Sequence, residues 1–221
     1  MNKDPLTENI EWVFSNIRPL TPEEAARREA ERRQEEEERR RAKAEQLFRA
    51  GGIPPRHRDA TQVNRDGPWG AAETKLLAKL DTGAEMALVG KCGPGKTQLG
   101  VEILRAGAER LYRVRYATAT EFFLDLTASF KDPRETERDV INEYFKPRVL
   151  VLDEMDKRAE KEWHQRLLFE LADRRYRNVV KYTLLIANQE KAEFIDSIGP
   201  SLASRMRETG GIIVCDWPSF R

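Results

Sequence analysis

The chain has little cysteine and histidine, two of each in 221 residues, and these four side chains are not spaced as metal ligands. It has no run of about eighteen apolar residues and no signal-peptide pattern at its start, so we expect a cytoplasmic protein that makes no contact with a membrane. It also lacks a net charge of one sign, because 39 Lys and Arg oppose 38 Asp and Glu. Any nucleic-acid site must therefore be a local patch.

The most informative segment is glycine-rich and follows a short apolar stretch at 86–89. It matches the phosphate-loop pattern G-x-x-x-x-G-K-[ST] with the residues Gly90, Lys91, Cys92, Gly93, Pro94, Gly95, Lys96 and Thr97. A helix-compatible stretch follows, and the alternative is an ordinary glycine-rich turn before a helix. In the phosphate-loop interpretation, glycines let backbone N–H groups surround phosphate oxygens and Lys96 contacts the β- and γ-phosphates. Because the Thr97 hydroxyl would ligate Mg²⁺, we expect ATP and Mg²⁺ as cofactors.

A second apolar run, 149–152, ends in the two acids Asp153 and Glu154. Such a run is typical of a buried parallel strand, and ionised carboxylates belong at its carboxyl end, where open α/β sheets bind ligands. We expect Asp153 to hold Mg²⁺, directly or through water, and Glu154 to polarise the attacking water. The alternative is a strand that ends in a solvated turn.

The chain divides into three parts by composition: an apolar group in residues 1–20, a charged helix with its linker in 21–55, and a compact domain in 56–221. Thr21 is suited to cap the charged helix, with Pro22 and two acids in its first turn. Since Glu and Arg alternate without an apolar seam, this segment is a solvated helical spacer or a disordered tract.

The compact domain contains five apolar segments separated by amphipathic helices, at 86–89, 111–117, 149–153, 181–187 and 212–215. This order predicts an α/β fold with a five-stranded parallel sheet between helices. Right-handed crossovers then bring the phosphate loop and both acids to one edge of the sheet.

Three further polar residues have two interpretations each. Asn188 follows a predicted strand, so it either orients the attacking water or forms a turn. Arg205 and Arg207 either contact a γ-phosphate across a subunit interface or are solvated.

Several later blocks together resemble the bacterial helicase-loader ATPases of the DnaC type, which are AAA+ proteins related to the IstB-type transposition ATPases. The resemblance covers about residues 50–221. It is carried by the blocks Gly51–Arg56, Val149–Glu154, Asp173–Tyr176, Leu185–Asn188, Ser204–Gly211 and Val214–Arg221.

The resemblance implies roles for individual residues. Asn188 corresponds to the sensor-1 residue, and Arg205 to the arginine finger that reaches a neighbour's ATP, with Arg207 as the alternative. Arg221 corresponds to an arginine near the γ-phosphate. A single-stranded DNA channel would be formed by Phe130, Lys131, Lys161 and Trp163. Stacking and phosphate attraction suit such a channel, although both aromatic residues could instead pack in the core.

The resemblance also implies a function: an ATPase that loads or remodels a replicative helicase on single-stranded DNA and assembles into a homo-oligomeric ring or spiral with ATP. The alternatives are an IstB-type transposition helper and a nucleotide-gated adaptor with negligible turnover. Because the chain ends at Arg221, we expect an AAA+ core without a full helical lid.

Overall fold

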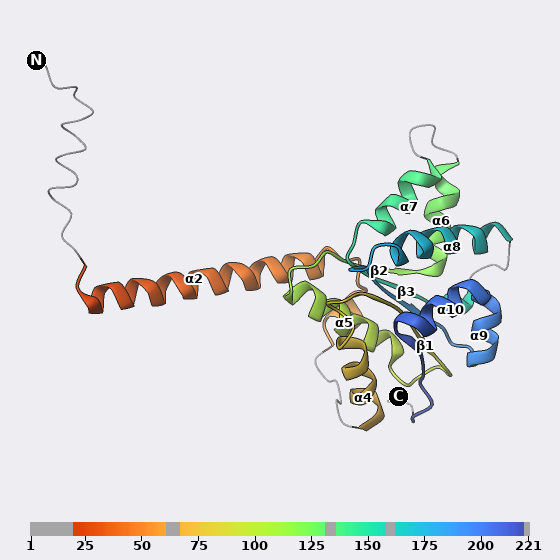
Figure 1. Ribbon diagram of the computed structural model, residues 1–221, viewed down its shortest axis with the longest axis horizontal. Coiled ribbons are helices and arrows are strands. Elements are labelled where there is room, and N and C mark those ends of the chain that lie inside the picture. Colours follow the sequence, from red (N-terminus) through yellow and green to blue (C-terminus); the bar gives the residue numbers. More distant parts are fainter. Residues whose placement is uncertain (1–19, 61–66, 131–135, 158–161, 219–221) are drawn as a thin grey trace, which may run out of the picture. The chain divides into compact units, whose positions relative to one another are not determined.

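The computed structural model describes residues 20–60, 67–130, 136–157 and 162–218, and the chain divides into two units, Met1–Arg41 and Ala42–Arg221 (Figure 1). In the first unit the structure describes the beginning of helix α2 (Pro22–Arg49). The Thr21 hydroxyl accepts a hydrogen bond from the Glu24 N–H at 3.2 Å, and Glu24 accepts one from the Thr21 N–H at 2.9 Å. Thr21 therefore caps α2 as the sequence predicts. Glu–Arg ion pairs four residues apart, such as Arg27–Glu31 at 2.9 Å, line the exposed surface of this helix.

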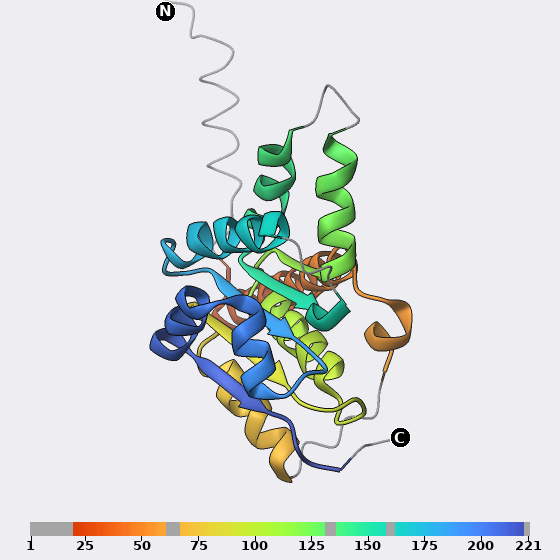
Figure 2. The ribbon, with the colours of Figure 1, turned by 90° about the vertical axis from the view of Figure 1, so that its right-hand side faces the viewer.

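The second unit is built on a parallel five-stranded sheet, as expected, with the strand order β2-β3-β4-β1-β5 (Figures 1 and 2). The strands are β1 (Ala84–Val89), β2 (Val114–Thr118), β3 (Val149–Asp153), β4 (Tyr182–Ile186) and β5 (Gly211–Val214). The three central strands are buried along their whole length, which explains their continuous apolar sequences.

One face of the sheet is covered by α4 (Gly67–Leu77) and α5 (Lys96–Glu109), while the short α3 (Pro55–Arg58) contacts α5. Leu76 from α4 and Leu99 and Ile103 from α5 pack there against alternate residues of the strands. Phe48 and Ile53 are also buried in this layer, although the sequence placed both residues ahead of the compact domain. The last turns of α2 and the following linker thus pack with the second unit.

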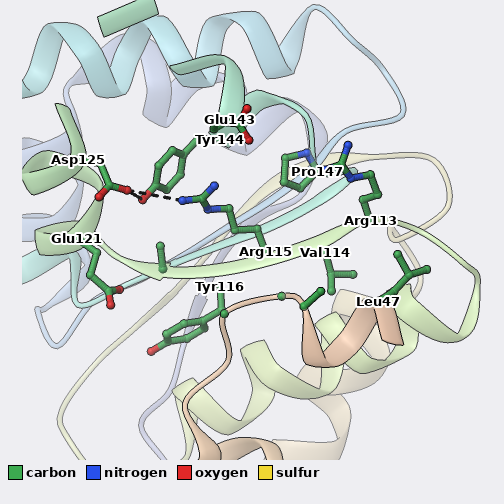
Figure 3. Close-up of a pocket in the computed structure, with 14 residues that line it drawn as sticks. Leu47, Arg113, Val114, Arg115, Tyr116, Glu121, Asp125, Glu143, Tyr144 and Pro147 are labelled. Atoms are coloured by element: carbon green, nitrogen blue, oxygen red, sulfur yellow. Dashed lines mark hydrogen bonds and ion pairs between the residues drawn. The ribbon is translucent and has the colours of Figure 1, made fainter. Parts of the chain in front are cut away.

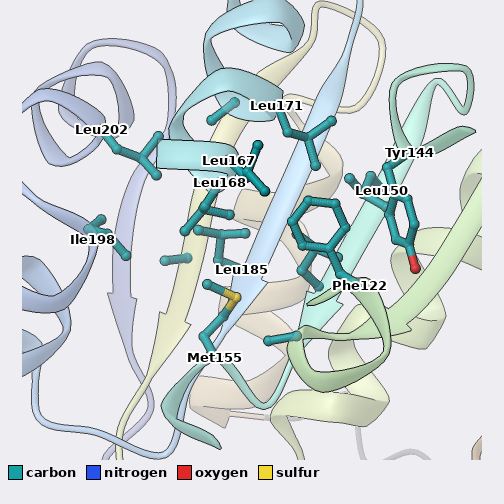
Figure 4. Close-up of a cluster of buried hydrophobic side chains, with 14 of the residues drawn as sticks. Phe122, Tyr144, Leu150, Met155, Leu167, Leu168, Leu171, Leu185, Ile198 and Leu202 are labelled. Carbon is teal, nitrogen blue, oxygen red and sulfur yellow. The ribbon is translucent and has the colours of Figure 1, made fainter. Parts of the chain in front are cut away.

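The other face carries the remaining helices, and Figure 4 shows its buried cluster, with leucines of α8 packed over β3 and β4. These helices are α6 (Ala119–Ser129), α7 (Glu137–Phe145), α8 (Glu162–Tyr176), α9 (Lys191–Ile198) and α10 (Pro200–Thr209), together with the 3-10 turn η1 (Met155–Lys157). The sheet therefore lies between two helical layers that bury both of its faces. Up to residue 218, β5 is the last described element, and no helical lid follows it there.

The predicted strand boundaries differ from the observed ones by at most three residues, most at the start of the second strand. The second strand begins at Val114 instead of residue 111, because Leu111 has a left-handed backbone (φ 61°) where the chain turns out of α5. The Leu111 and Tyr112 N–H groups bond the last carbonyls of that helix, so these residues belong to its termination. Arg205 and Arg207 both lie within helix α10, which has Pro200 in its first turn.

None of the helices in the described residues is long and apolar enough to cross a membrane.

Candidate nucleotide site

The loop after β1 follows a path that requires glycine. Gly90, Gly93 and Gly95 have positive φ angles of 126°, 108° and 80°. A Cβ atom at Gly90 would lie 2.6 Å from the Cys215 carbonyl oxygen, and the Gly90 N–H donates to the Gln189 carbonyl at 2.9 Å. The loop is thus fixed between the segments that follow β4 and β5, in a conformation that only glycine adopts at low cost.

The ammonium group of Lys96 lies inside this loop. Its Nζ donates to the carbonyl oxygens of Gly90 at 2.8 Å and Lys91 at 2.6 Å, and its side chain is buried. Burial lowers the pKa of Lys96, while nearby thiol and carboxyl groups oppose that shift. Outside the loop, the Trp217 indole N–H donates to the Pro94 carbonyl at 2.8 Å. The loop therefore surrounds a cation, as a phosphate site requires.

The end of β3 meets the start of α5 through one hydrogen bond. The Thr97 hydroxyl donates to Asp153 Oδ2 at 2.7 Å, and Asp153 is 3% exposed. A hydroxyl and a carboxylate are hard oxygen ligands of the kind Mg²⁺ accepts, so these residues fit the expected ion. Among the described residues, no group of three or more Asp, Glu, His or Cys side chains is arranged so that it could hold a metal ion by itself. An ion here would therefore complete its coordination with phosphate and water oxygens.

Glu154 and Asn188 follow the ends of the neighbouring strands β3 and β4. Glu154 follows Asp153 with a left-handed backbone (φ 56°), and its carboxylate forms an ion pair with Lys157 at 2.5 Å. The Asn188 N–H donates to Asp156 Oδ1 at 2.8 Å, which ties the segment after β4 to the segment after β3. The left-handed backbone at a non-glycine residue is costly and directs Glu154 out of the strand.

The two arginines of α10 lie away from the phosphate loop, on the helix that leads into the beginning of β5. Arg205 forms an ion pair with Asp173 at 2.5 Å and lies over the rings of Phe169 and Tyr176, 4.9 Å from each centroid. Arg207 is exposed and forms no ion pair with the residues that the structure describes. Neither arginine completes the nucleotide site of its own chain.

The proposed DNA residues are described only in part. The rings of Phe130 and Trp163 lie 5.3 Å apart, and Phe130 is 57% exposed. The Trp163 indole N–H donates to Glu137 at 3.3 Å, and its ring packs against the core cluster. The pair is thus partly exposed to solvent and partly packed against the core. Lys131, Lys161 and Arg221 fall outside the described residues.

Two residues that bond the predicted groups carry no recognisable signal in the sequence. The Tyr116 hydroxyl donates to Asp153 Oδ2 at 2.9 Å, and Asp173 holds Arg205. Tyr116 belongs to no motif and looks like an ordinary strand residue, while the Asp173 pairing joins residues thirty-two positions apart. Only the folded arrangement brings these groups together.

A parallel sheet with its phosphate loop after β1 and an acid-ended strand at β3 defines a P-loop NTPase, and the strand order is that of the AAA+ core. Comparison with known families agrees with this class. The profile of the family described as IstB-like ATP binding protein matches residues 25–200, so the chain belongs to that family.

The relatives of this chain include an insertion-sequence protein and a helicase loader. A putative ATP-binding protein in an insertion sequence of Mycobacterium tuberculosis is 32% identical over 151 residues, which are 66% of this chain and 59% of that protein. The replicative helicase loader DnaC of Escherichia coli is 23% identical over 187 residues, or 81% of this chain and 76% of the loader. The chain thus spans less than two thirds of the first relative.

Solved structures share the fold. The DnaC helicase loader covers 76% of this chain and 97% of its own, with a TM-score of 0.58 and 17% identity. The replication initiator DnaA bound to AMPPCP and single-stranded DNA gives a TM-score of 0.61 at 21% identity, covering 75% of this chain and 51% of its own.

Proposed function

We propose that this protein is a Mg²⁺-dependent ATPase that assembles with ATP into a ring or spiral and loads or remodels a replicative helicase on single-stranded DNA. The observation that carries this proposal is a division within the chain. Lys96, Thr97 and Asp153 meet at the loop after β1 and the end of β3, while the α10 arginines lie apart from them. A second copy could bring its arginines to the first copy's nucleotide.

In this proposal each residue has one task. Lys96 contacts the phosphates, and Thr97 and Asp153 hold Mg²⁺, which when bound neutralises phosphate charge. Glu154 accepts a proton from the attacking water, and Asn188 orients that water. Glu154 must first leave Lys157, to which it is paired in this structure.

The test of the chemistry is Glu154→Gln. An amide cannot accept the proton, so turnover should fall at least about a hundredfold, while ATP affinity changes by less than about twofold. The exposed Glu193→Gln is a matched control on α9. Turnover is measured as phosphate release and affinity with a fluorescent ATP analogue. Normal turnover in Glu154→Gln contradicts the assigned role, and negligible turnover in the unaltered protein favours the adaptor alternative.

The partner requires a separate test. The alignment with the loader DnaC spans more of this chain than the alignment with the insertion-sequence protein, which supports a helicase as partner. A transposase is the alternative. It is supported by the matched family and by the higher sequence identity of the insertion-sequence protein. Binding is measured with a purified replicative helicase and with a purified transposase, each with ATP and with ADP. Binding to the transposase alone would favour the transposition helper.

The proposed DNA surface centres on Phe130 and Trp163. If both rings stack on bases, each Ala substitution should weaken binding of a labelled single strand by about five- to a hundredfold. The exposed Phe130 is the cleaner test, because its truncation leaves no buried cavity. Anisotropy with ATP and with ADP measures the effect, and a folded Phe130→Ala protein with normal DNA affinity contradicts this surface.

A further inference from the structure

The residue that contacts the metal site from outside any motif is Tyr116, on the edge strand β2. A cavity of about 530 Å³ lies along this strand, and Figure 3 shows Arg115 and Tyr144 on one side of the strand and Tyr116 on the other. The Tyr116 side chain therefore belongs to the α5 layer, where it is 7% exposed. From there its hydroxyl reaches Asp153 Oδ2 at 2.9 Å.

Three donors surround the Asp153 carboxylate. Oδ2 accepts from the hydroxyls of Tyr116 and Thr97, at 2.9 and 2.7 Å, and Oδ1 accepts from the Glu154 N–H at 2.7 Å. Because donors bond both oxygens, rotation of the carboxylate about its Cβ–Cγ bond would break hydrogen bonds in a buried site. Direct ligation of a metal by Oδ2 would displace one of the two hydroxyls.

Tyr116 is itself held from the other side. Its N–H donates to the Gly51 carbonyl at 2.7 Å, and a Cβ atom at Gly52 would lie 3.0 Å from the Tyr116 carbonyl oxygen. The linker after α2 thus runs against the edge of β2 at this residue.

We propose that Tyr116 is a positioning residue of the metal site, whose hydroxyl fixes the Asp153 carboxylate and, through it, the Thr97 hydroxyl that would hold Mg²⁺. This inference rests on the proposed function, because it assumes that Mg²⁺ and ATP bind together. The Thr97 oxygen keeps lone pairs for the ion while its O–H group donates its hydrogen bond to Asp153 Oδ2. Mg²⁺ suits such an arrangement, since it retains several waters in protein sites.

The test is Tyr116→Phe, which removes only the hydroxyl. ATP affinity is measured by equilibrium binding across a Mg²⁺ titration and again in EDTA. We expect the Mg²⁺-dependent gain in affinity to fall about two- to tenfold, and affinity in EDTA to stay unchanged. The matched control is Tyr144→Phe, which removes a hydroxyl bonded at 2.7 Å to another carboxylate, that of Asp125, away from the phosphate loop. It should change neither measurement.

Each outcome bears on one proposal. An unaltered protein whose ATP affinity does not respond to Mg²⁺ contradicts the proposed function itself. If the unaltered protein responds and Tyr116→Phe responds equally, or loses the same affinity in EDTA, the positioning role is overturned. Asp153→Asn supplies a second check, because Tyr116→Phe added to it should cause no further loss of the Mg²⁺ response. A further loss there would show that Tyr116 does not act through the Asp153 carboxylate.

Discussion

The two ends of the sheet differ in how their charged side chains are buried and bonded. At the carboxyl ends of the strands, Lys96 and Asp153 are at most 4% exposed and are bonded to neighbours within the site. At the opposite end, α10 carries Arg207 on the surface and Arg205 in a pair with Asp173 that involves no phosphate-loop residue. The first site is preorganised within one chain. At the second, Arg205 is paired with Asp173 and Arg207 is exposed, and neither arginine contacts the phosphate loop.

This difference indicates how the protein could couple assembly to chemistry. A preorganised cradle binds nucleotide without a partner, because its donors are already in position. An arginine that must act on another copy contributes only after assembly, so turnover would depend on the oligomer while binding would not. Substitutions at the two ends should therefore have separable effects.

The largest effect is expected at the arginine end. Arg205→Ala should bind ATP normally and lose turnover about a thousandfold, because the transition-state charge lacks its cation. Mixing Arg205→Ala with Lys96→Ala subunits should restore part of the turnover, since the second variant still supplies Arg205 to sites on the first. Phosphate release is measured over a range of mixing ratios.

Arg207→Ala is the matched control on the same helix, and we expect its turnover to stay within about twofold. A loss in Arg207→Ala instead of Arg205→Ala would transfer the role to the exposed arginine. Absence of rescue in subunits shown to co-assemble would contradict an arginine that acts on a neighbour.

At the phosphate end, Lys96→Ala should weaken ATP binding at least about a hundredfold, or about 3 kcal/mol, because the cation inside the loop is lost. Lys91→Ala, at an exposed position of the same loop, should change affinity only a few-fold. Calorimetry measures both affinities. Similar losses in the two variants would show that general charge, and not the position of Lys96, governs binding.

The phosphate end could be predicted from the sequence because its chemistry depends on residues close together in the chain. Glycines, lysine and threonine at fixed spacing determine the backbone path of the loop, and the acid-ended apolar run determines where β3 ends. The five strands were likewise visible as apolar segments and are confirmed.

Two side-chain contacts could not be predicted, because each depends on groups that only the fold brings together. No local pattern pairs Arg205 with Asp173 or places the Tyr116 hydroxyl on Asp153. The strand boundary at Leu111 was wrong for a different reason, since an apolar residue in a left-handed turn looks like a strand residue in sequence. Contacts between distant elements decide the two pairings, whereas a local turn decides the boundary at Leu111.

A moderate effect on stability is expected at Glu85, which lies on β1, where the positive charges of Arg205 and Arg175 act on its carboxylate. Its carboxylate is 2% exposed, and neither oxygen finds a hydrogen-bond partner among the described residues. Burial raises the pKa of Glu85 to about 7, from 4.5 in an unstructured chain, while the two arginines oppose and Asp173 adds to that shift.

Because the folded state keeps this proton longer, the free energy of unfolding should fall as pH rises from about 4.5 to 7, by about 3 kcal/mol, and then level off. Glu85→Gln should remove this contribution, so it should match the unaltered protein near pH 5 and exceed it near pH 8. Urea unfolding measures both, with Glu193→Gln as the exposed control. Equal pH slopes in the unaltered and Glu85→Gln proteins would contradict the buried proton.

The smallest effect, about 1 kcal/mol of unfolding free energy, is expected for Asp173→Asn, which removes a charge that pairs with both Arg205 at 2.5 Å and Arg177 at 2.6 Å. The more informative measurement on this variant is its ATP turnover. If Arg205 acts on a neighbour, releasing it from Asp173 should leave turnover of the assembled protein equal or higher, in contrast to Arg205→Ala. If Asp173→Asn loses turnover as severely as Arg205→Ala, activity requires the ion pair itself, and the arginine end functions within its own chain. Urea unfolding and phosphate release on the same preparations separate the two effects.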